Sequence, residues 1–255
     1  MEPDDTKQKY ILNSVDNALT ILNLFFDYEE LSTVEIAKLV GVSRSTAFRF
    51  MITLENRGFL AKTEKGTYRL GLNLFSLGML AYNRMELAAL LHPLLTQIAH
   101  ETGETCHLGI FDDSVHIMFI DKALGTSQLK MDTALGYRQY AHCTATGKAI
   151  LAFQSSQTIQ EYLKKTTFEQ FTTHSISNAK ELLSLLKKIK QDGYACDNEE
   201  AEWGLTCYAV PILDASQRAF AAVSISGPTT RMTRNKDRHI KRLQSLLASF
   251  SKKLY

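Results

Sequence analysis

Residues 41–60 read GVSRSTAFRFMITLENRGFL, and in them a helix end is followed at once by a helix start. Gly41 is of the residue type that closes helices, and Ser43 is of a type that caps a new one. Apolar residues then return at three-to-four spacing, which predicts a third helix with Ala47, Phe50, Met51 and Leu54 on its buried side. Two short helices joined by so tight a turn predict a helix-turn-helix, whose second helix can enter the major groove of DNA.

The opposite face of this third helix is expected to be exposed and cationic, because helical spacing sends its two arginines outward. Guanidinium groups and hydroxyls near a helix start can reach phosphates and base edges, so we expect this face to contact DNA. The candidate contacts on it are Ser43, Arg44, Ser45, Thr46, Phe48 and Arg49. The alternative is that the arginines only solvate a surface, or that the face binds a protein.

Two earlier helices are expected to complete the motif. Ser14 is a plausible cap for the first, and its apolar positions are Val15, Leu19, Leu22 and Phe26. Ser32 or Thr33 can cap the second, and its apolar positions are Val34, Ala37, Leu39 and Val40.

A β-hairpin is expected behind the helix-turn-helix. Strand-like runs at 59–63 and 67–70 flank a Glu-Lys-Gly turn, a pattern that predicts the wing of a winged helix. Lys62, Lys65 and Arg69 could then touch the DNA backbone beside the groove. Residues 31–71 hold seven basic and three acidic side chains, a local balance of +4 in a chain whose total is +2.

The next 32 or so residues are apolar at helical spacing across more than one helix. A connector so rich in leucine and methionine often packs against a copy of itself, so we predict a homodimer. Paired recognition helices about one turn of DNA apart would read palindromic half-sites.

The remainder of the chain predicts an α+β domain built on a sheet. Strand-like runs cover 106–113, 114–123 and 129–135, helical runs cover 146–153, 156–165 and 178–192, and strands return at 194–201, 205–214 and 220–228 before a final helix at 235–254. Strands with helices grouped around them favour an α+β sheet that can hold a cavity on one face.

Several polar positions of this domain are candidates for one small-molecule site. Thr144, Ala145 and Thr146 precede a helix, where free N–H groups and the helix dipole attract an anion such as a carboxylate. Strand alternation sends Ser224 and Ser226 to one face and their apolar neighbours to the other. The expected effector-binding residues are Ala145, Thr146, Asp197, Leu205, Cys207, Ser224 and Ser226.

Each of these positions also has an ordinary structural interpretation. Paired strand serines are commonly solvated, Cys207 could be a small core residue, and Asp197 could cap a turn. His107, His116 and His142 could approach one another, but they lack ligand-like local spacing, so no metal is expected.

Enzyme motifs are missing from the sequence. The ATGKA segment fails the phosphate-loop pattern at two positions, and there is no nucleophile elbow, zinc-protease motif or dinucleotide fingerprint, so neither catalytic residues nor a cofactor are expected. The polar N-terminus, the absence of a long apolar run and four dispersed cysteines favour a reduced, cytoplasmic protein.

The order of these parts resembles the IclR-type bacterial transcriptional regulators over nearly the whole chain. The similarity lies in LSTVEIAKLVGVSRSTAFRFMITLENRGFL, YRLGLNLFSLG, TATGKAILA, DGYACDNEEAEWGLTCYAVPILD and FAAVSISGP. It implies a winged helix-turn-helix at 1–72 with a disordered tail at 1–9, a linker helix at 73–90, and a GAF-like effector-binding and oligomerisation domain with an antiparallel sheet at 91–255. It also implies the seven effector-binding residues named above and a dimer of dimers on promoter DNA.

Together these features predict a DNA-binding repressor gated by a small carboxylate. Within the family, HLG, DNEEAEWGLTCYAVP and SIS look most like the branch that represses sugar-acid catabolism, such as 2-keto-3-deoxygluconate repressors. The chain departs from the family at Tyr140, Ala141 and His142, where the loop over the pocket is expected to differ. Two alternatives stay open: an enzyme acting on a small acid, and a structural DNA-binding protein without a ligand.

Overall fold

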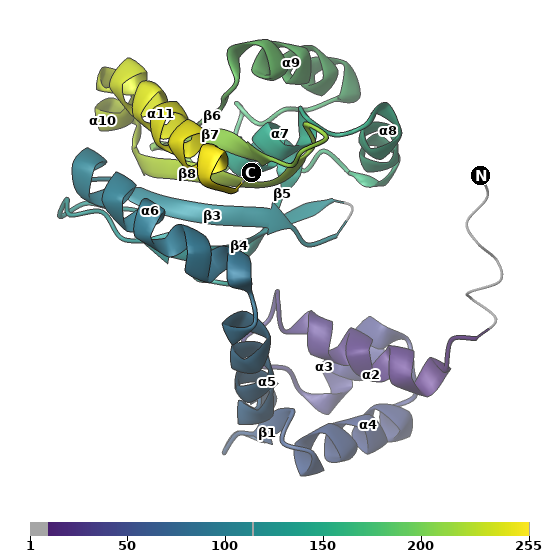
Figure 1. The fold of residues 1–255 in the computed structure, drawn as a ribbon. Helices are drawn as coiled ribbons and strands as arrows, with labels where there is room; N and C mark the ends of the chain where they lie inside the picture. Colours follow the sequence, from purple (N-terminus) through teal and green to yellow (C-terminus); the bar gives the residue numbers. More distant parts are fainter. Residues whose placement is uncertain (1–9, 114, 255) are drawn as a thin grey trace. The chain divides into compact units, whose positions relative to one another are not determined.

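The structure is a computed structural model that describes residues 10–113 and 115–254. The chain divides into two compact units, one up to Arg84 and one from Met85 onward (Figure 1). The tail expected at 1–9 lies outside the described residues.

In its described part, from residue 10 onward, the first unit contains three helices, a hairpin and a fourth helix. The helices are α2 (Asn13–Leu24), α3 (Thr33–Val40) and α4 (Arg44–Asn56), the hairpin is β1 (Leu60–Lys62) with β2 (Tyr68–Leu70), and α5 (Leu72–Asn83) follows. The hairpin is antiparallel, with Leu60 opposite Leu70, so the predicted winged helix-turn-helix is confirmed.

The junction between α3 and α4 forms as the sequence predicts. Gly41 closes α3 in the left-handed region with φ 75°, where a residue with a Cβ is strained. The Ser43 hydroxyl then accepts a hydrogen bond from the Thr46 N–H at 3.1 Å and caps α4. At the start of α3, Ser32 and Glu35 form a reciprocal capping box, which identifies Ser32 as the cap. These local contacts set the tight turn between the two helices.

The buried face of α4 is the predicted one. Ala47, Met51 and Leu54 are buried and Phe50 is partly buried against the same cluster. Each fully buried aliphatic side chain contributes about 1.5–3 kcal/mol, so this stripe holds α4 with its arginine face outward.

The predicted apolar faces of α2 and α3 are wrong in part. In α2 the buried residue is Ile21, whereas Val15, Leu19 and Phe26 are about half exposed or more, and Leu12 rather than Ser14 occupies the cap position. In α3, Ile36 is buried beside Ala37, whereas Val34 and Leu39 are exposed. Both helices carry apolar residues on more than one side, and packing selects the stripe that faces Leu31 and Tyr68.

The range 73–90, expected to be one linker helix, contains parts of two helices. It holds most of α5 and the start of α6 (Glu86–Thr102), with Arg84 and Met85 between them. None of the α5 side chains is buried.

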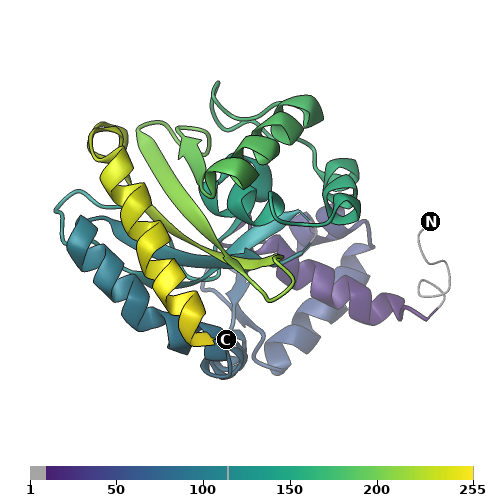
Figure 2. The same ribbon diagram turned by 45° about the horizontal axis from the view of Figure 1, so that its top comes forward.

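The second unit is an antiparallel sheet with helices on both faces (Figures 1 and 2). Its strands are β3 (Thr105–Phe111), β4 (His116–Ala123), β5 (Arg138–Tyr140), β6 (Ala195–Asn198), β7 (Leu205–Leu213) and β8 (Ala219–Pro228), in the spatial order β5-β4-β3-β8-β7-β6. Helix α6 packs on β3 and β4, and α11 (Lys236–Leu254) packs on β7. The other face receives α7 (Ala145–Leu151), behind which lies α9 (Ala179–Asp192).

Strand alternation divides the second unit into two cores. Val223 and Ile225 of β8 face the cluster formed with α6 and α11, whereas Ala222 belongs to the cluster under α7 and α9. The α7 side of the sheet carries small residues, and a Cβ on Gly109 would lie 2.7 Å from the Thr146 methyl carbon. This absence of bulk lets α7 approach the sheet closely.

The predicted element order of the second unit is largely confirmed, with local differences. The segment 129–135, predicted as a strand, is irregular, and the strand in this region is the short β5 instead. The 3₁₀ turn η1 (Ala141–Cys143) and α10 (Thr229–Arg234) were not predicted, whereas α8 (Ser156–Lys165) matches its predicted bounds. Among residues 10–113 and 115–254, no helix has the length and apolarity that crossing a bilayer requires.

Candidate functional site

The outer face of α4 presents a cationic surface. Arg44, Ser45, Phe48 and Arg49 are all exposed, and about half of the Phe48 side chain is open to solvent. The Ser43 hydroxyl lies 2.8 Å from the Thr46 hydroxyl, and both groups are engaged at the start of the helix. Of the six candidate contacts on α4, the two arginines therefore have the longest reach and the fewest competing contacts.

The hairpin places three more basic side chains on the same unit. Lys62, Lys65 and Arg69 are exposed, and Arg69 stands opposite Ala61 across the two strands. The Lys62 ammonium lies 5.9 Å from the centre of the Tyr68 ring, a cation–π contact that leaves the charge in solvent.

A cavity in the second unit is lined by all seven residues that the sequence analysis selected as effector-binding. It lies between α7 and its face of the sheet. The remaining lining residues are His107, Phe119, Met131, Thr133, Gln139, Thr144 and Ala201.

The register of the sheet explains why residues distant in sequence meet in this cavity. Ser226 of β8 pairs with Thr105 on one side and Cys207 on the other, and Cys207 pairs with Asp197. Directly opposite residues share a face of an antiparallel sheet, so these four form one polar row across four strands. In the next row, Ser224 stands opposite His107.

Helix α7 supplies the other wall of the cavity. The Thr146 hydroxyl donates to the Ser224 Oγ at 3.0 Å, so the helix is tied to the sheet inside the cavity. The side chain of Thr144 caps α7 by accepting from the Gly147 N–H at 3.0 Å. The helix has only seven residues, Ala145–Leu151, so its dipole is small. What α7 offers a ligand is its first N–H groups, on Ala145 and Thr146, which have no acceptor within the helix.

Asp197 is both a turn cap and a cavity wall. Its side chain is 1% exposed, and one carboxylate oxygen accepts from the Glu200 N–H at 2.7 Å. Burial raises the pKa of Asp197 to about 7, an effect that the nearby Lys148 ammonium opposes. The carboxyl can therefore meet a ligand hydroxyl either as acceptor or as donor.

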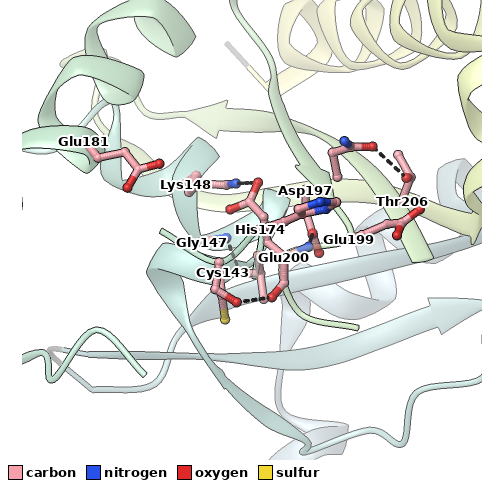
Figure 3. Close-up of polar contacts among 12 residues, drawn as sticks. Cys143, Gly147, Lys148, His174, Glu181, Asp197, Glu199, Glu200 and Thr206 are labelled. Atoms are coloured by element: carbon pink, nitrogen blue, oxygen red, sulfur yellow. Dashed lines mark hydrogen bonds and ion pairs between the residues drawn. The ribbon is translucent and has the colours of Figure 1, made fainter. Parts of the chain in front are cut away.

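Beside Asp197 lies a buried ion pair that the sequence analysis missed. Lys148 of α7 is 0% exposed and its ammonium pairs with the Glu200 carboxylate, as Figure 3 shows. The Glu200 carbonyl accepts from the Ser175 hydroxyl at 2.5 Å, which connects the pair to the loop before α9. The available signal was the position of Lys148, one turn after the cap of a helix that is otherwise composed of small and apolar residues.

His107 is a cavity residue whose role was missed. His107 is 2% exposed, and its Nδ1 lies 3.3 Å from the Ser226 hydroxyl, whereas the buried Nε2 has no hydrogen-bond partner among residues 10–113 and 115–254. His116 instead contacts Asp113 and His142 contacts Tyr162, so the three histidines considered for a metal do not converge. In the described part of the chain, no group of three His, Cys, Asp or Glu side chains has the geometry of a metal site.

The segment 124–137, called the cover below, contributes Met131 and Thr133 to one side of the cavity. Its carbonyls accept hydrogen bonds from Thr105 at Met131 (2.6 Å), from Lys122 at Thr133 (2.7 Å) and from Arg231 at Leu129 (2.7 Å). The space left inside is about 30 Å³, room for one or two water molecules. A larger ligand can fit only if the cover or α7 moves.

Tyr140, one of the three positions where the chain departs from the family, is not among the residues that line the cavity. Its ring packs against His116 at 4.5 Å and against His142 at 5.6 Å, measured between ring centres. The cover contributes Met131 and Thr133 instead, and Gln139 lies beside them.

Comparison with known proteins identifies both units. The model of the IclR helix-turn-helix domain matches residues 14–64, and that of the bacterial transcriptional regulator IclR C-terminal domain matches residues 79–253. The HTH-type transcriptional regulator KdgR of Dickeya chrysanthemi is 34% identical over 97% of this chain and 82% of its own length. The transcriptional repressor IclR of Escherichia coli is 31% identical over 80% of this chain and 75% of its own length.

A solved structure agrees with these matches. The crystal structure of Thermotoga maritima IclR covers 95% of this chain and 98% of its own, with 34% identity and a TM-score of 0.69. Taken with the winged helix-turn-helix and the lined cavity, these similarities show that the chain belongs to the IclR family of bacterial transcriptional regulators.

Proposed function

We propose that the protein is a repressor of a catabolic operon for sugar acids or related carboxylates, and that a small carboxylate bound in the cavity of the second unit controls its hold on DNA. The observation that carries this proposal is the convergence of seven independently selected residues on one buried polar cavity. The relatives of this protein include a regulator named KdgR and a transcriptional repressor, and these relatives support a role in repression. The cavity is assigned a binding role and no catalytic step or cofactor.

The DNA contact is assigned to α4 and the hairpin. Arg44 and Arg49 project from a helix held by a buried stripe on its other side, the arrangement by which a recognition helix enters the major groove. Lys62, Lys65 and Arg69 would lie along the phosphates beside it. As a DNA-bound regulator, the protein is assigned to the cytoplasm.

The functional form is assigned as a homodimer that can pair into a dimer of dimers. Leu72, Phe75, Leu77 and Leu80 of α5 are each more than half exposed, and covering such apolar area favours association with a second copy. DNA binding is then assigned to the winged domain at 1–72 and dimerisation to the connecting segment at 73–90. Sensing of the effector is assigned to the domain at 91–255. Two recognition helices would read a palindromic operator.

The effector is assigned by the donors and acceptors in the cavity. Ser224 and the N–H groups of Ala145 and Thr146 can donate to carboxylate or carbonyl oxygens, whereas Ser226 can accept from a ligand hydroxyl and Asp197 can pair with one. The apolar side of Leu205 and the thiol of Cys207 complete the wall. The ligand can regulate only by binding the DNA-competent and DNA-incompetent arrangements unequally.

The DNA assignment is tested with Arg49→Ala and a matched control, Arg57→Ala, which removes the same charge from the other end of α4. Fluorescence anisotropy with duplex DNA over a range of salt concentrations measures both affinity and salt slope. If Arg49 contacts a phosphate, its loss should weaken binding to all sequences and lower the slope by about 1, because one fewer counterion is released. If the two variants show the same affinity for DNA and the same salt slope, the assignment of α4 to the groove is wrong.

The effector assignment is tested with the double variant Asp197→Ala, Ser224→Ala. An unpaired buried ligand hydroxyl costs about 1–3 kcal/mol, so the response of DNA binding to a carboxylate that acts on the native protein should be lost while affinity for DNA is kept. The control pair is Ser216→Ala with Asp237→Ala, both exposed and outside the cavity. A double cavity variant that responds normally would exclude these residues from the site.

A further inference from the structure

The cavity holds one buried polar atom that nothing in the described structure satisfies, the Nε2 of His107. The ring is 2% exposed, lines the cavity, and lies 5.1 Å from the Phe119 ring, measured between centres. Buried polar atoms in folded proteins are nearly always paired, so an unpaired one on a side chain that lines a cavity indicates a partner that arrives from outside.

The other ring nitrogen fixes which hydrogen Nε2 carries. Ser226 is 3% exposed, and the His107 Nδ1 at 3.3 Å is the contact that the structure gives its hydroxyl. If Nδ1 carried the proton, both the Ser226 hydroxyl hydrogen and the Nε2 lone pair would be buried without partners. If Ser226 donates to Nδ1, only the Nε2–H is unpaired, on a ring that lines the cavity. The second arrangement leaves fewer unsatisfied groups.

The charged groups around the ring favour a neutral imidazole. Lys122 stands opposite His107 on β4, and its ammonium is paired with Asp132 of the cover. Burial, and after it the charge of Lys122, lower the pKa of His107 to about 4, and Asp132 opposes this effect. A neutral ring has one donor to offer, and it does not attract an anion by charge.

We propose that His107, as the neutral tautomer with the proton on Nε2, is a specificity-determining residue that donates a hydrogen bond to a carbonyl or hydroxyl oxygen of the effector far from the end held by Asp197. This inference rests on the proposed effector role of the cavity. It adds to that role a residue and a constraint on the ligand.

The constraint is the length of the ligand. His107 lies on β3 and Asp197 on β6, three strands away in the order β3-β8-β7-β6. Neighbouring strands are about 4.8 Å apart, so the two backbones are separated by about 14 Å. A two- or three-carbon oxo acid is too short to contact both side chains, whereas a six-carbon sugar acid has oxygens along its whole length. The separation of the two side chains therefore favours the longer acid, which enters only when the cover or α7 moves, and His107 would contact the part of it that shorter acids lack.

The first test reads the ring without any ligand. In protein labelled with ¹⁵N-histidine, the two nitrogens of His107 are assigned by comparison with His107→Phe and observed by NMR. We expect a protonated Nε2, an unprotonated Nδ1, and no change on lowering the pH to about 5, because the pKa of the buried ring is about 4. A proton on Nδ1, or an imidazolium near neutral pH, would overturn the proposal.

The second test uses D-gluconate and pyruvate as long and short probes, with binding followed by calorimetry on the full chain. His107→Phe keeps the ring shape and removes the donor, and His107→Gln keeps an amide N–H close to the position of Nε2. We expect His107→Phe to weaken gluconate binding about tenfold or more, equivalent to about 1.4 kcal/mol, His107→Gln to recover part of it, and pyruvate binding to change little.

The outcomes separate this inference from the proposed function. If His107→Phe binds gluconate as tightly as the native protein, His107 is not the specificity residue, although the cavity can still be the effector site. If the native protein binds pyruvate but not gluconate, or neither probe, the length constraint is wrong. Regulated DNA binding is measured separately, by the anisotropy experiment with Arg49→Ala.

Discussion

Replacing Lys148 with methionine should destabilise the second unit strongly at neutral pH. The substitution keeps the length of the side chain and removes its charge from a site that is 0% exposed. It leaves the carboxylate of Glu200, whose side chain is 10% exposed, without the cation that compensates its burial. Breaking one side of a buried pair typically costs about 3–5 kcal/mol.

The loss of stability in Lys148→Met has an upper limit that depends on pH, because Glu200 can take up a proton instead of remaining charged. Its pKa is already above the ordinary value of 4.5, since burial outweighs the effect of Lys148. Holding a proton on a group with an unfolded pKa of 4.5 costs about 1.4 kcal/mol for each pH unit above that value. The loss of stability in Lys148→Met is therefore limited to about 3 kcal/mol at pH 7 and to less than about 1 kcal/mol at pH 5.

The assay is urea unfolding at fixed protein concentration, followed by the fluorescence of Trp203. This is the single tryptophan of the chain, and it lies in the second unit, 4.9 Å from the His174 ring between centres. Lys188→Met on the exposed side of α9 is the matched control and should change the free energy of unfolding by less than about 0.5 kcal/mol. The double variant Lys148→Met, Glu200→Met should recover most of the loss, because no buried charge is left from the pair.

Two results would refute this reasoning. One is a Lys148→Met protein as stable at pH 7 as the native protein, which would mean that Glu200 is solvated. The other is a double variant no more stable than the single one, which would mean that the methionine is poorly packed and that the lost charge is not the cause.

Three further outcomes are expected from local geometry. Gly41→Ala should cost about 1–2 kcal/mol of stability in the first unit by thermal unfolding, because φ is 75° and the strain persists although the space around it is open. Ser43→Ala should cost about 1 kcal/mol, since the Thr46 N–H loses its cap, and Ser43→Asp should restore it. Asp197→Asn should flatten the pH dependence of stability between about pH 4 and pH 7. The pKa of Asp197 is about 7 in the folded protein and 3.8 in the unfolded chain, so the folded protein binds one extra proton in this range. The native protein therefore loses stability from this group as the pH rises through the range, and the asparagine variant does not. Urea unfolding at several pH values that showed parallel curves for the two proteins would contradict this expectation.

The features that could be predicted from the sequence are those determined by residues close together in the chain. The end of α3 and the start of α4 follow from Gly41 and Ser43, whose preferences act over a few residues. The cavity face of β8 follows from strict alternation, because one side of that strand is all apolar and Ser224 and Ser226 occupy the other.

What could not be predicted depends on contacts between distant segments. Helix α2 offers two apolar stripes, and only its packing selects Ile21 over Val15 and Leu19. The pairing of Lys148 with Glu200 joins residues 52 apart in sequence, and the isolated lysine of α7 gives no indication of its partner. His107 drew attention as a possible metal ligand, and its actual neighbours became clear only when β3 was found beside β8.

The cover over the cavity has a kinetic consequence. Three hydrogen bonds to the carbonyls of Leu129, Met131 and Thr133 hold it closed over a space of about 30 Å³. A ligand that enters by displacing the cover must wait until some of these bonds open, so on that route the observed rate of association should level off at high ligand concentration, at the rate of opening. Weakening an anchor, as Thr105→Val would, should raise that plateau. On that route, the rate at which the regulator responds is set by how fast the cover opens, independently of its affinity for the ligand.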